Sequence, residues 1–91
     1  MSHFARHVRV TGQVQGVFFR AWAAEQARAL GITGWIRNAP DGSVGAHLEG
    51  EQWSVHQLIE LLHKGPPAAQ VAAVAVEETE AERSDRFEVR H

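Results

Sequence analysis

The residues best suited to chemistry lie in the stretch Gly12–Arg20, which follows an alternating, strand-like run. Backbone amides in a glycine-containing loop and in the first turn of a helix lack internal partners, and their dipoles favour an anion. Gly12 and Gly16 let a ligand approach the backbone closely. Arg20 adds a permanent cation whose planar fork suits two phosphate oxygens. The stretch therefore predicts a site for a phosphate-like group.

Two better-known glycine loops are excluded by spacing. A Walker loop needs Gly-x4-Gly-Lys-Ser/Thr, and the chain contains no Lys-Ser or Lys-Thr pair. A Rossmann fingerprint needs Gly-x-Gly-x-x-Gly, which the spacing of Gly12 and Gly16 does not provide. A strand, a loop with two glycines and a helix also form many plain connections. On its own, this stretch leaves both interpretations open.

A second segment decides between them. The run G-x-V-Q-G-V-x-F-R at Gly12–Arg20 is followed by G-W-x-x-N-x-x-x-G-x-V at Gly34–Val44. Together, in this order, the two runs resemble the acylphosphatase family, and the resemblance extends from about Phe4 to Arg90. It implies an enzyme that hydrolyses the carboxyl–phosphate bond of an acyl phosphate, which gives a carboxylate and inorganic phosphate.

The resemblance also implies roles for single residues. Arg20 holds the phosphoryl oxygens, and Asn38 controls a water molecule. Because a carboxamide is too weak a base to deprotonate water, Asn38 is expected to orient it. The phosphoryl group is also expected to be held by the backbone N–H groups of Gln15, Gly16, Val17, Phe18 and Phe19.

No cofactor, metal or covalent intermediate is expected. The predicted site offers no serine or cysteine nucleophile, and the nearby chain has no carboxylate cluster for magnesium. An acyl phosphate carries a good leaving group, so positioning and charge stabilisation suffice. The plainer interpretations are that Arg20 is a surface cation and that Asn38 is only a turn residue.

Two positions depart from the family pattern. Ile36 stands where the family usually has a smaller residue, and it is expected to change strand packing without changing the reaction. Phe18 occupies a position where glycine is also common, and it is expected to narrow the pocket entrance and influence substrate choice.

Hydrophobic periodicity predicts an α+β fold of the ferredoxin-like, split β-α-β type. Two helices should cover one face of a mainly antiparallel sheet. Gly31 and Gly65-Pro66-Pro67 are natural helix stops, and a bulge is expected in the fourth strand, where the apolar pattern slips. The expected strands are His7–Thr11, Ile32–Arg37, Ser43–Glu49, Val71–Glu77 and Arg86–Arg90; the helices are Phe19–Leu30 and a second one containing Val55–Leu62.

This topology brings the two motif segments together. In a split β-α-β unit the first two strands are parallel, with the third strand between them, so their carboxyl ends emerge at one edge of the sheet. Neighbouring strands lie roughly 4.8 Å apart, so those ends are about 10 Å apart. Arg20 follows the first strand and Asn38 follows the second, and both are therefore expected at one site.

Size and composition limit the remaining possibilities. The chain has 91 residues, no cysteine and a net charge of −2. It is expected to be one acylphosphatase-like domain, residues 1–91, acting as a monomer on a small-molecule acyl phosphate. The acidic balance disfavours nucleic acid. No apolar run approaches the roughly 18 residues of a membrane span, and Met1–Arg6 lacks the apolar core of a signal peptide, so the cytoplasm is expected.

The histidines and the acidic run near the C-terminus are expected to be solvent-exposed. His56 and His63 lie two helical turns apart, about 10 Å, which is too far to share one ion. The acidic run Glu77–Glu82 is interpreted as a solvated loop or a frayed strand end. The six histidines, all outside the motif segments, are His3, His7, His47, His56, His63 and His91.

Two other functions share this strand–helix order. An RNA-recognition module would need an exposed aromatic pair on its central strands, and the predicted outward residues there include none. A regulatory domain would bind phosphate or a phosphorylated metabolite without turnover. The outward residues are predicted to be His7, Arg9 and Thr11 in the first strand and Ser43, Gly45, His47 and Glu49 in the third.

Overall fold

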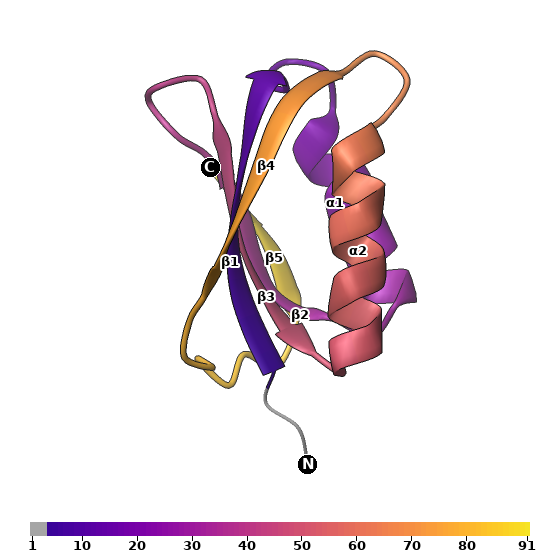
Figure 1. Ribbon diagram of the computed structural model, residues 1–91, viewed down its shortest axis with the longest axis vertical. Coiled ribbons are helices and arrows are strands. Elements are labelled where there is room, and N and C mark those ends of the chain that lie inside the picture. The colour runs from indigo at the N-terminus through magenta and orange to yellow at the C-terminus, as the bar shows by residue number, and fades with distance from the viewer. Residues whose placement is uncertain (1–3) are drawn as a thin grey trace.

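Two helices pack on one face of a five-stranded sheet in the computed structural model, which describes residues 4–91 (Figure 1). The predicted fold class and element order are confirmed; His3 lies outside the described residues. The elements are β1 (Phe4–Gln13), α1 (Phe19–Ala29), β2 (Thr33–Asn38), β3 (Val44–Gly50), α2 (Gln52–Lys64), β4 (Gln70–Glu78) and β5 (Phe87–Arg90).

The strand order places three strand ends at one edge of the sheet. The order is β4-β1-β3-β2-β5, with β3 antiparallel to both β1 and β2 and with β5 parallel to β2. The predicted parallel relation of β1 and β2 is therefore confirmed. Val44 of β3 pairs with Val10 on one side and with Asn38 on the other. The ends of β1 and β2 are thus two strand spacings apart, about 10 Å.

The core lies between the sheet and the helices. Side chains alternate along each strand, so every second residue of β1 and β3 points toward the helices. Phe19, Ala23 and Ala27 form the buried stripe of α1, as predicted, and Leu30 just beyond it is half-buried. Against them lie the buried residues Val8, Val10, Val44, Ala46, Leu48, Val55, Leu58, Ile59 and Leu62.

The structure differs from the prediction most clearly in β1. This strand starts at Phe4, three residues before the predicted start, because Phe4, Ala5 and Arg6 all pair with β3. The expected bulge lies where the pairing steps from Thr11–Ala73 to Gly12–Val71. Gly12 has φ +121°, and a Cβ there would lie 2.2 Å from the carbonyl oxygen of Gln70. A glycine is therefore needed at this step.

The sheet face away from the helices is partly covered by residues 79–86, which link β4 to β5. His47 points to that face, as strand alternation predicts, but its exposed fraction is 1%. The predicted solvent exposure of His47 is therefore wrong, because sequence alternation does not reveal a loop folded over the strand. His56, His63 and His91 are exposed, and His7 is half-buried. Within residues 4–91, no helix has the length and apolar character needed to cross a membrane.

Candidate active site

The loop between β1 and α1 is anchored by apolar side chains that pack into the core. Val14 and Phe19 are each 1% exposed, and Val17 is half-buried against the same core. Gly16 has φ +75° and Phe18, the residue before α1, has φ 60° and ψ 25°. Both residues are therefore in the left-handed region, which turns the backbone sharply into the helix. The expected packing of Val14, Val17 and Phe19 beneath the loop is confirmed.

The amides of this loop are available to a ligand. In the described part of the chain, none of the amides from Gln15 to Phe18 donates a hydrogen bond to another backbone group. The first backbone bond of α1 runs from the amide of Trp22 to the carbonyl of Phe18, at 3.0 Å. No acidic residue lies in the first turn of α1. Amides without a backbone partner and the positive end of the helix dipole thus lie together at the start of α1.

Arg20 lies in that first turn and is held by the end of β5. Its Nη1 donates a 2.7 Å hydrogen bond to the carbonyl oxygen of Arg90 and lies 3.4 Å from Nδ1 of His91. None of the ion pairs found among residues 4–91 involves Arg20. Its positive charge is therefore not neutralised by a neighbouring carboxylate.

Asn38 is the last residue of β2 and is exposed. The turn after it is closed by a 2.8 Å bond from the Ala39 amide to the Ser43 carbonyl. Asp41 accepts hydrogen bonds from the amide and the hydroxyl of Ser43, at 2.9 and 2.6 Å, and pairs with Arg9. The Ser43 bonds, followed by Arg9, hold the pKa of Asp41 well below its ordinary value. The turn that follows Asn38 is therefore braced internally.

The side chain of Gln15 joins the loop to that turn. Its Nε2 donates two hydrogen bonds of 2.8 Å, to the carbonyl oxygens of Ala39 and Ser43. This contact fixes the loop relative to Asn38, across 24 residues of sequence. Sequence reasoning assigned Gln15 a role only through its backbone amide. No local sequence signal marks this role of the side chain, because the contact depends on how the loop and the turn meet in the fold.

Arg20 and Asn38 line one cavity of about 300 Å³. The other lining residues come from the β1–α1 loop, the first turn of α1 and the C-terminal end of the chain. Gln15 and Val17 do not line the cavity. Val89 and His91 were not predicted as site residues. Their signal would have been the parallel pairing of β5 with β2, which brings the end of β5 to this edge. The remaining lining residues are Val14, Gly16, Phe18, Phe19, Ala21, Val89 and His91.

The chemistry of this lining favours binding an anion and orienting water. Among the described residues that form the wall, no side chain carries a carboxylate, a hydroxyl or a thiol. Arg20 supplies the positive charge, Asn38 supplies a carboxamide, and the loop supplies backbone donors. The imidazole of His91 is the remaining polar group. A dianion bound here would meet donors and a cation and no negatively charged side chain.

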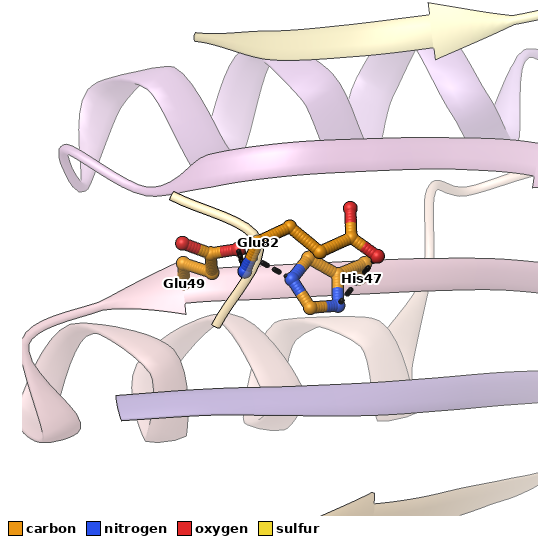
Figure 2. A group of neighbouring side chains, drawn as sticks. All are labelled: His47, Glu49 and Glu82. Atoms are coloured by element: carbon orange, nitrogen blue, oxygen red, sulfur yellow. Dashed lines mark hydrogen bonds and ion pairs between the residues drawn. The ribbon is translucent and has the colours of Figure 1, made fainter. Parts of the chain in front are cut away.

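A separate polar cluster lies on the sheet face away from the helices, outside the cavity lining (Figure 2). His47, Glu49 and Glu82 each offer one potential metal-ligand atom, and these atoms lie within 4.8 Å of one another. Sequence analysis missed this group because Glu82 lies 33 residues beyond Glu49 in the chain and reaches it only through the covering loop.

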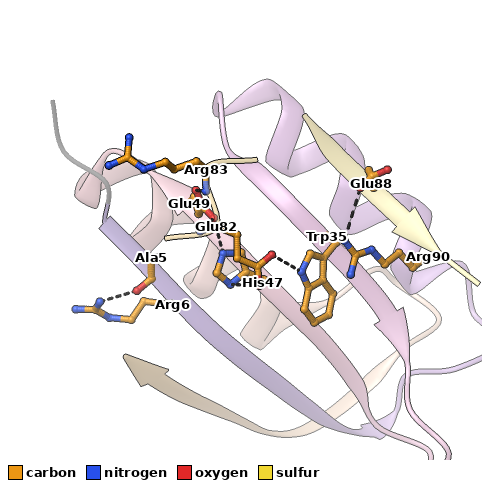
Figure 3. Close-up of polar contacts among 9 residues, drawn as sticks. All are labelled: Ala5, Arg6, Trp35, His47, Glu49, Glu82, Arg83, Glu88 and Arg90. Atoms are coloured by element: carbon orange, nitrogen blue, oxygen red, sulfur yellow. Dashed lines mark hydrogen bonds and ion pairs between the residues drawn. The ribbon is translucent and has the colours of Figure 1, made fainter. Parts of the chain in front are cut away.

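In this cluster, the carboxylate of Glu49 accepts hydrogen bonds from residues 79–86 and holds that loop against the sheet. His47 donates from Nε2 to Oε2 of Glu49 at 2.5 Å, and the amides of Glu82 and Arg83 donate to the same carboxylate at 2.5 and 3.0 Å (Figure 3). Burial raises the pKa of Glu49, but the bonds from His47 and the two amides outweigh it and leave the pKa below its ordinary value. A metal ion would have to displace these hydrogen bonds. The cluster therefore attaches residues 79–86 to the sheet.

Trp35 occupies the same face and is covered. Its Nε1 donates a 3.1 Å hydrogen bond to Glu82, and its ring stacks on His47 (Figure 3). The guanidinium carbons of Arg37 and Arg90 lie 5.3 and 4.8 Å from the ring centre. With 8% of its surface exposed, Trp35 does not offer a free stacking platform.

Comparison with known proteins places this arrangement in a family. The acylphosphatase family model matches residues 6–89. The acylphosphatase of Rubrobacter xylanophilus is 52% identical over 84 residues, which cover 91% of this chain and 76% of that protein. The structure of an acylphosphatase from Coxiella burnetii is 42% identical, with a TM-score of 0.93 over 97% of this chain and 93% of that one. The acylphosphatase structure from Bacillus subtilis is 29% identical, with a TM-score of 0.94 over 97% and 99% of the two chains. The chain thus belongs to the acylphosphatase family, whose members are hydrolases that act on acyl phosphates.

Proposed function

We propose that the cavity between the β1–α1 loop and Asn38 hydrolyses acyl phosphates by phosphate clamping and water orientation, without a metal or a covalent intermediate. The observation that carries this proposal is that Arg20 and Asn38, eighteen positions apart in the sequence, line one cavity beside unpartnered backbone amides. Positioning and preorganised charge are the main sources of catalysis in phosphoryl transfer.

The phosphoryl group binds at the start of α1. The amides of Gly16, Phe18 and Phe19, three residues that line the cavity, donate to its oxygens. The amides of Gln15 and Val17 complete the expected set of donors from the neighbouring positions of the loop, and Arg20 adds charge-assisted hydrogen bonds. The contacts of Arg20 with the Arg90 carbonyl and with His91 both use Nη1, so the N–H groups on Nη2 and Nε remain for the ligand. The donors are held in place before substrate arrives, and the site gains transition-state stabilisation without reorganising.

Asn38 holds the attacking water on the other side of phosphorus. Its carboxamide accepts one hydrogen bond from the water and so directs an oxygen lone pair toward phosphorus. A phosphoryl oxygen takes the water proton, because the carboxamide cannot. The bond from phosphorus to the bridging oxygen breaks, and the carboxylate departs with the electron pair. A carboxylate whose conjugate acid has a pKa of about 4 is a good leaving group, so no general acid is required.

The lining supports direct attack by water. Among its described residues, no side chain offers a carboxylate to hold a magnesium ion, or a hydroxyl or thiol to form a phosphoryl-enzyme. His91 is the one lining side chain with a nucleophilic nitrogen, and its Nδ1 lies beside Arg20. A histidine phosphorylated during turnover is therefore the specific alternative, and His91→Asn tests it because asparagine cannot form that intermediate.

The deciding experiment is a hydrolysis assay with chelator present, using acetyl phosphate, benzoyl phosphate and one phosphate monoester. We expect both acyl phosphates to be hydrolysed and the monoester to be left intact. In ¹⁸O-water the label should appear in inorganic phosphate, because water attacks phosphorus. Activity that disappears with chelator, or turnover abolished in His91→Asn without loss of phosphate binding, would contradict the proposal. Binding of phosphate with no turnover would instead identify a regulatory domain.

We further propose that residues 1–91 act as one monomeric domain in the cytoplasm and do not bind nucleic acid. The buried position of Trp35 and the net charge of −2 support the last point. Titration with single-stranded RNA at moderate salt tests it, and tight binding would revive the RNA-recognition alternative. Light scattering of the purified protein tests the oligomeric state.

A further inference from the structure

Phe18 is an exposed aromatic residue at the mouth of the cavity. Its exposed fraction of 85% exceeds those of Trp53, 65%, and Val76, 43%. Single exposed apolar side chains are ordinary on protein surfaces. Phe18 differs from the other two because it lines the cavity that contains Arg20 and Asn38.

The backbone of Phe18 is also unusual. Its φ of 60° is a conformation that favours glycine, and within residues 4–91 only Arg83 shares it among non-glycine residues. The position precedes α1, where serine, threonine, aspartate or asparagine would cap the helix, and the phenylalanine side chain caps nothing. Neither core packing nor helix capping explains the ring. Strained non-glycine residues concentrate at ligand sites, where the ligand interaction offsets their cost.

The position of the ring relative to the bound phosphate suggests what it contacts. With the phosphoryl group on the loop amides and Arg20, in-line attack places the acyl group on the side of phosphorus away from the water. The cavity volume of about 300 Å³ is at the low end for small-molecule sites. An acyl group longer than acetyl must therefore extend toward the mouth, where Phe18 lies.

We propose that the Phe18 ring packs against the acyl group and makes the enzyme prefer aromatic or extended apolar acyl phosphates over acetyl phosphate. The apolar lining residues Val14, Phe19, Ala21 and Val89 continue the same surface inward. This inference depends on the proposed function, because it specifies the substrate class of the same site. An aromatic contact of this kind contributes a preference of roughly five- to tenfold.

The test compares wild type with Phe18→Gly and Phe18→Leu on benzoyl phosphate and acetyl phosphate. Glycine removes the ring and suits a φ of 60°, so this variant should fold at least as well as wild type. Both substrates share the phosphoryl group, so effects of the substitution on the loop cancel in the ratio of kcat/KM values. We expect this benzoyl-to-acetyl ratio to fall roughly five- to tenfold in Phe18→Gly and less in Phe18→Leu. A ratio unchanged within twofold in Phe18→Gly would overturn the inference.

Trp53→Ala is the matched control, since Trp53 is also a large exposed aromatic residue but lies on α2 outside the cavity lining. Its ratio should equal that of wild type; an equal fall in both variants would contradict a specific contact with Phe18. Binding of phenylphosphonate and methylphosphonate, followed by NMR, provides a readout without turnover. If no acyl phosphate is hydrolysed, the proposed function fails. The phosphonate pair still tests Phe18, and a preference for the phenyl compound that survives in Phe18→Gly would overturn its role.

Discussion

Arg20 and Arg90 are joined by a 2.7 Å hydrogen bond from the guanidinium Nη1 of the first to the backbone carbonyl of the second, across 70 residues of sequence. The bond ties the cation at the start of α1 to the end of β5. Because β5 runs parallel to β2, its end reaches the same edge of the sheet as Asn38. The last strand therefore contributes to the site by positioning a residue of the first helix.

Arg20→Ala should abolish phosphate binding and turnover together. The substitution removes the one permanently charged side chain among the described residues that line the cavity, and losses of at least about a hundredfold in kcat/KM are expected for a group that stabilises transition-state charge. Arg20→Lys should recover only a small part, because an ammonium group lacks the planar fork. Steady-state kinetics with inhibition by inorganic phosphate measures both effects.

Arg28→Ala is the control for that experiment. Arg28 is on the same helix, and its Nη2 donates a 2.9 Å bond to the carbonyl of Phe87, also in β5. The variant loses an equivalent tie, about 1 kcal/mol of stability, but no group of the cavity. Its phosphate inhibition should match that of wild type. A loss of phosphate binding in Arg28→Ala would show that docking of β5, and not the charge of Arg20, accounts for the Arg20 result.

Asn38→Ala should separate binding from turnover. Asn38 orients the water and does not hold the phosphoryl group in the proposed mechanism. Inhibition by inorganic phosphate should stay within about threefold of wild type, while kcat falls roughly a hundredfold. Asn38→Asp should instead weaken phosphate binding, because it adds a negative charge next to a dianion. If Asn38→Ala lost phosphate affinity as severely as Arg20→Ala does, Asn38 would have to be assigned to phosphate binding.

Gln15→Leu should impair catalysis although the side chain of Gln15 does not line the cavity. The variant keeps the size of the side chain but loses both donors to Ala39 and Ser43. Both carbonyls keep a backbone donor, the amide of Gly42 for Ala39 and the amide of Ala39 for Ser43. Losing the two side-chain bonds should therefore cost about 2 kcal/mol of stability, roughly 1 kcal/mol for each bond. The loop would also shift relative to Asn38, and kcat should fall about tenfold. Gln13→Leu, an exposed glutamine at the end of β1, is the control and should show neither change. Urea unfolding and steady-state kinetics give the two readouts; wild-type values for Gln15→Leu would contradict the positioning role.

Much of this structure was predictable because its determinants are local. Alternation in β1 and β3, the apolar stripe of α1 and the turn at Pro40–Gly42 each act over a few residues, and the split β-α-β order follows from them. The family resemblance selected Arg20 and Asn38, and the rule that parallel strands end at the same edge of the sheet then predicted that the two residues converge on one site.

The remaining features depend on tertiary contacts that no local pattern encodes. The tie from Arg20 to Arg90 requires knowing that β5 pairs beside β2. The burial of His47 could be predicted only by knowing that residues 79–86 cross the sheet face away from the helices. Gly34 illustrates the same limit, because a Cβ there would lie 1.8 Å from the carbonyl oxygen of His47 on the neighbouring strand. The motif marks this glycine, but the reason for it is a close approach of two backbones.

The hydrogen bonds that the Glu49 carboxylate accepts should make the stability of the protein fall at acid pH. Its pKa is below the ordinary value of 4.5 in the folded state, so its contribution is complete above that pH and is lost as the pH falls further. Glu49→Gln replaces a charged acceptor of three hydrogen bonds by an amide that cannot accept all of them. The variant should be less stable by about 2–3 kcal/mol at pH 7.

The gap between wild type and Glu49→Gln should then narrow below about pH 4.5, the ordinary pKa of the group, because wild type loses the same charged acceptor by protonation. Urea unfolding at pH 7, 5.5, 4 and 3 measures the gap directly. Glu60→Gln, on the exposed side of α2, is the control and should track wild type at every pH. A gap of constant size from pH 7 to pH 3 would mean that packing, and not the ionised carboxylate, holds residues 79–86 against the sheet. Because β5 follows this loop directly and ends at Arg90, whose carbonyl accepts the hydrogen bond from Arg20, Glu49→Gln should also show weaker inhibition by phosphate at pH 7.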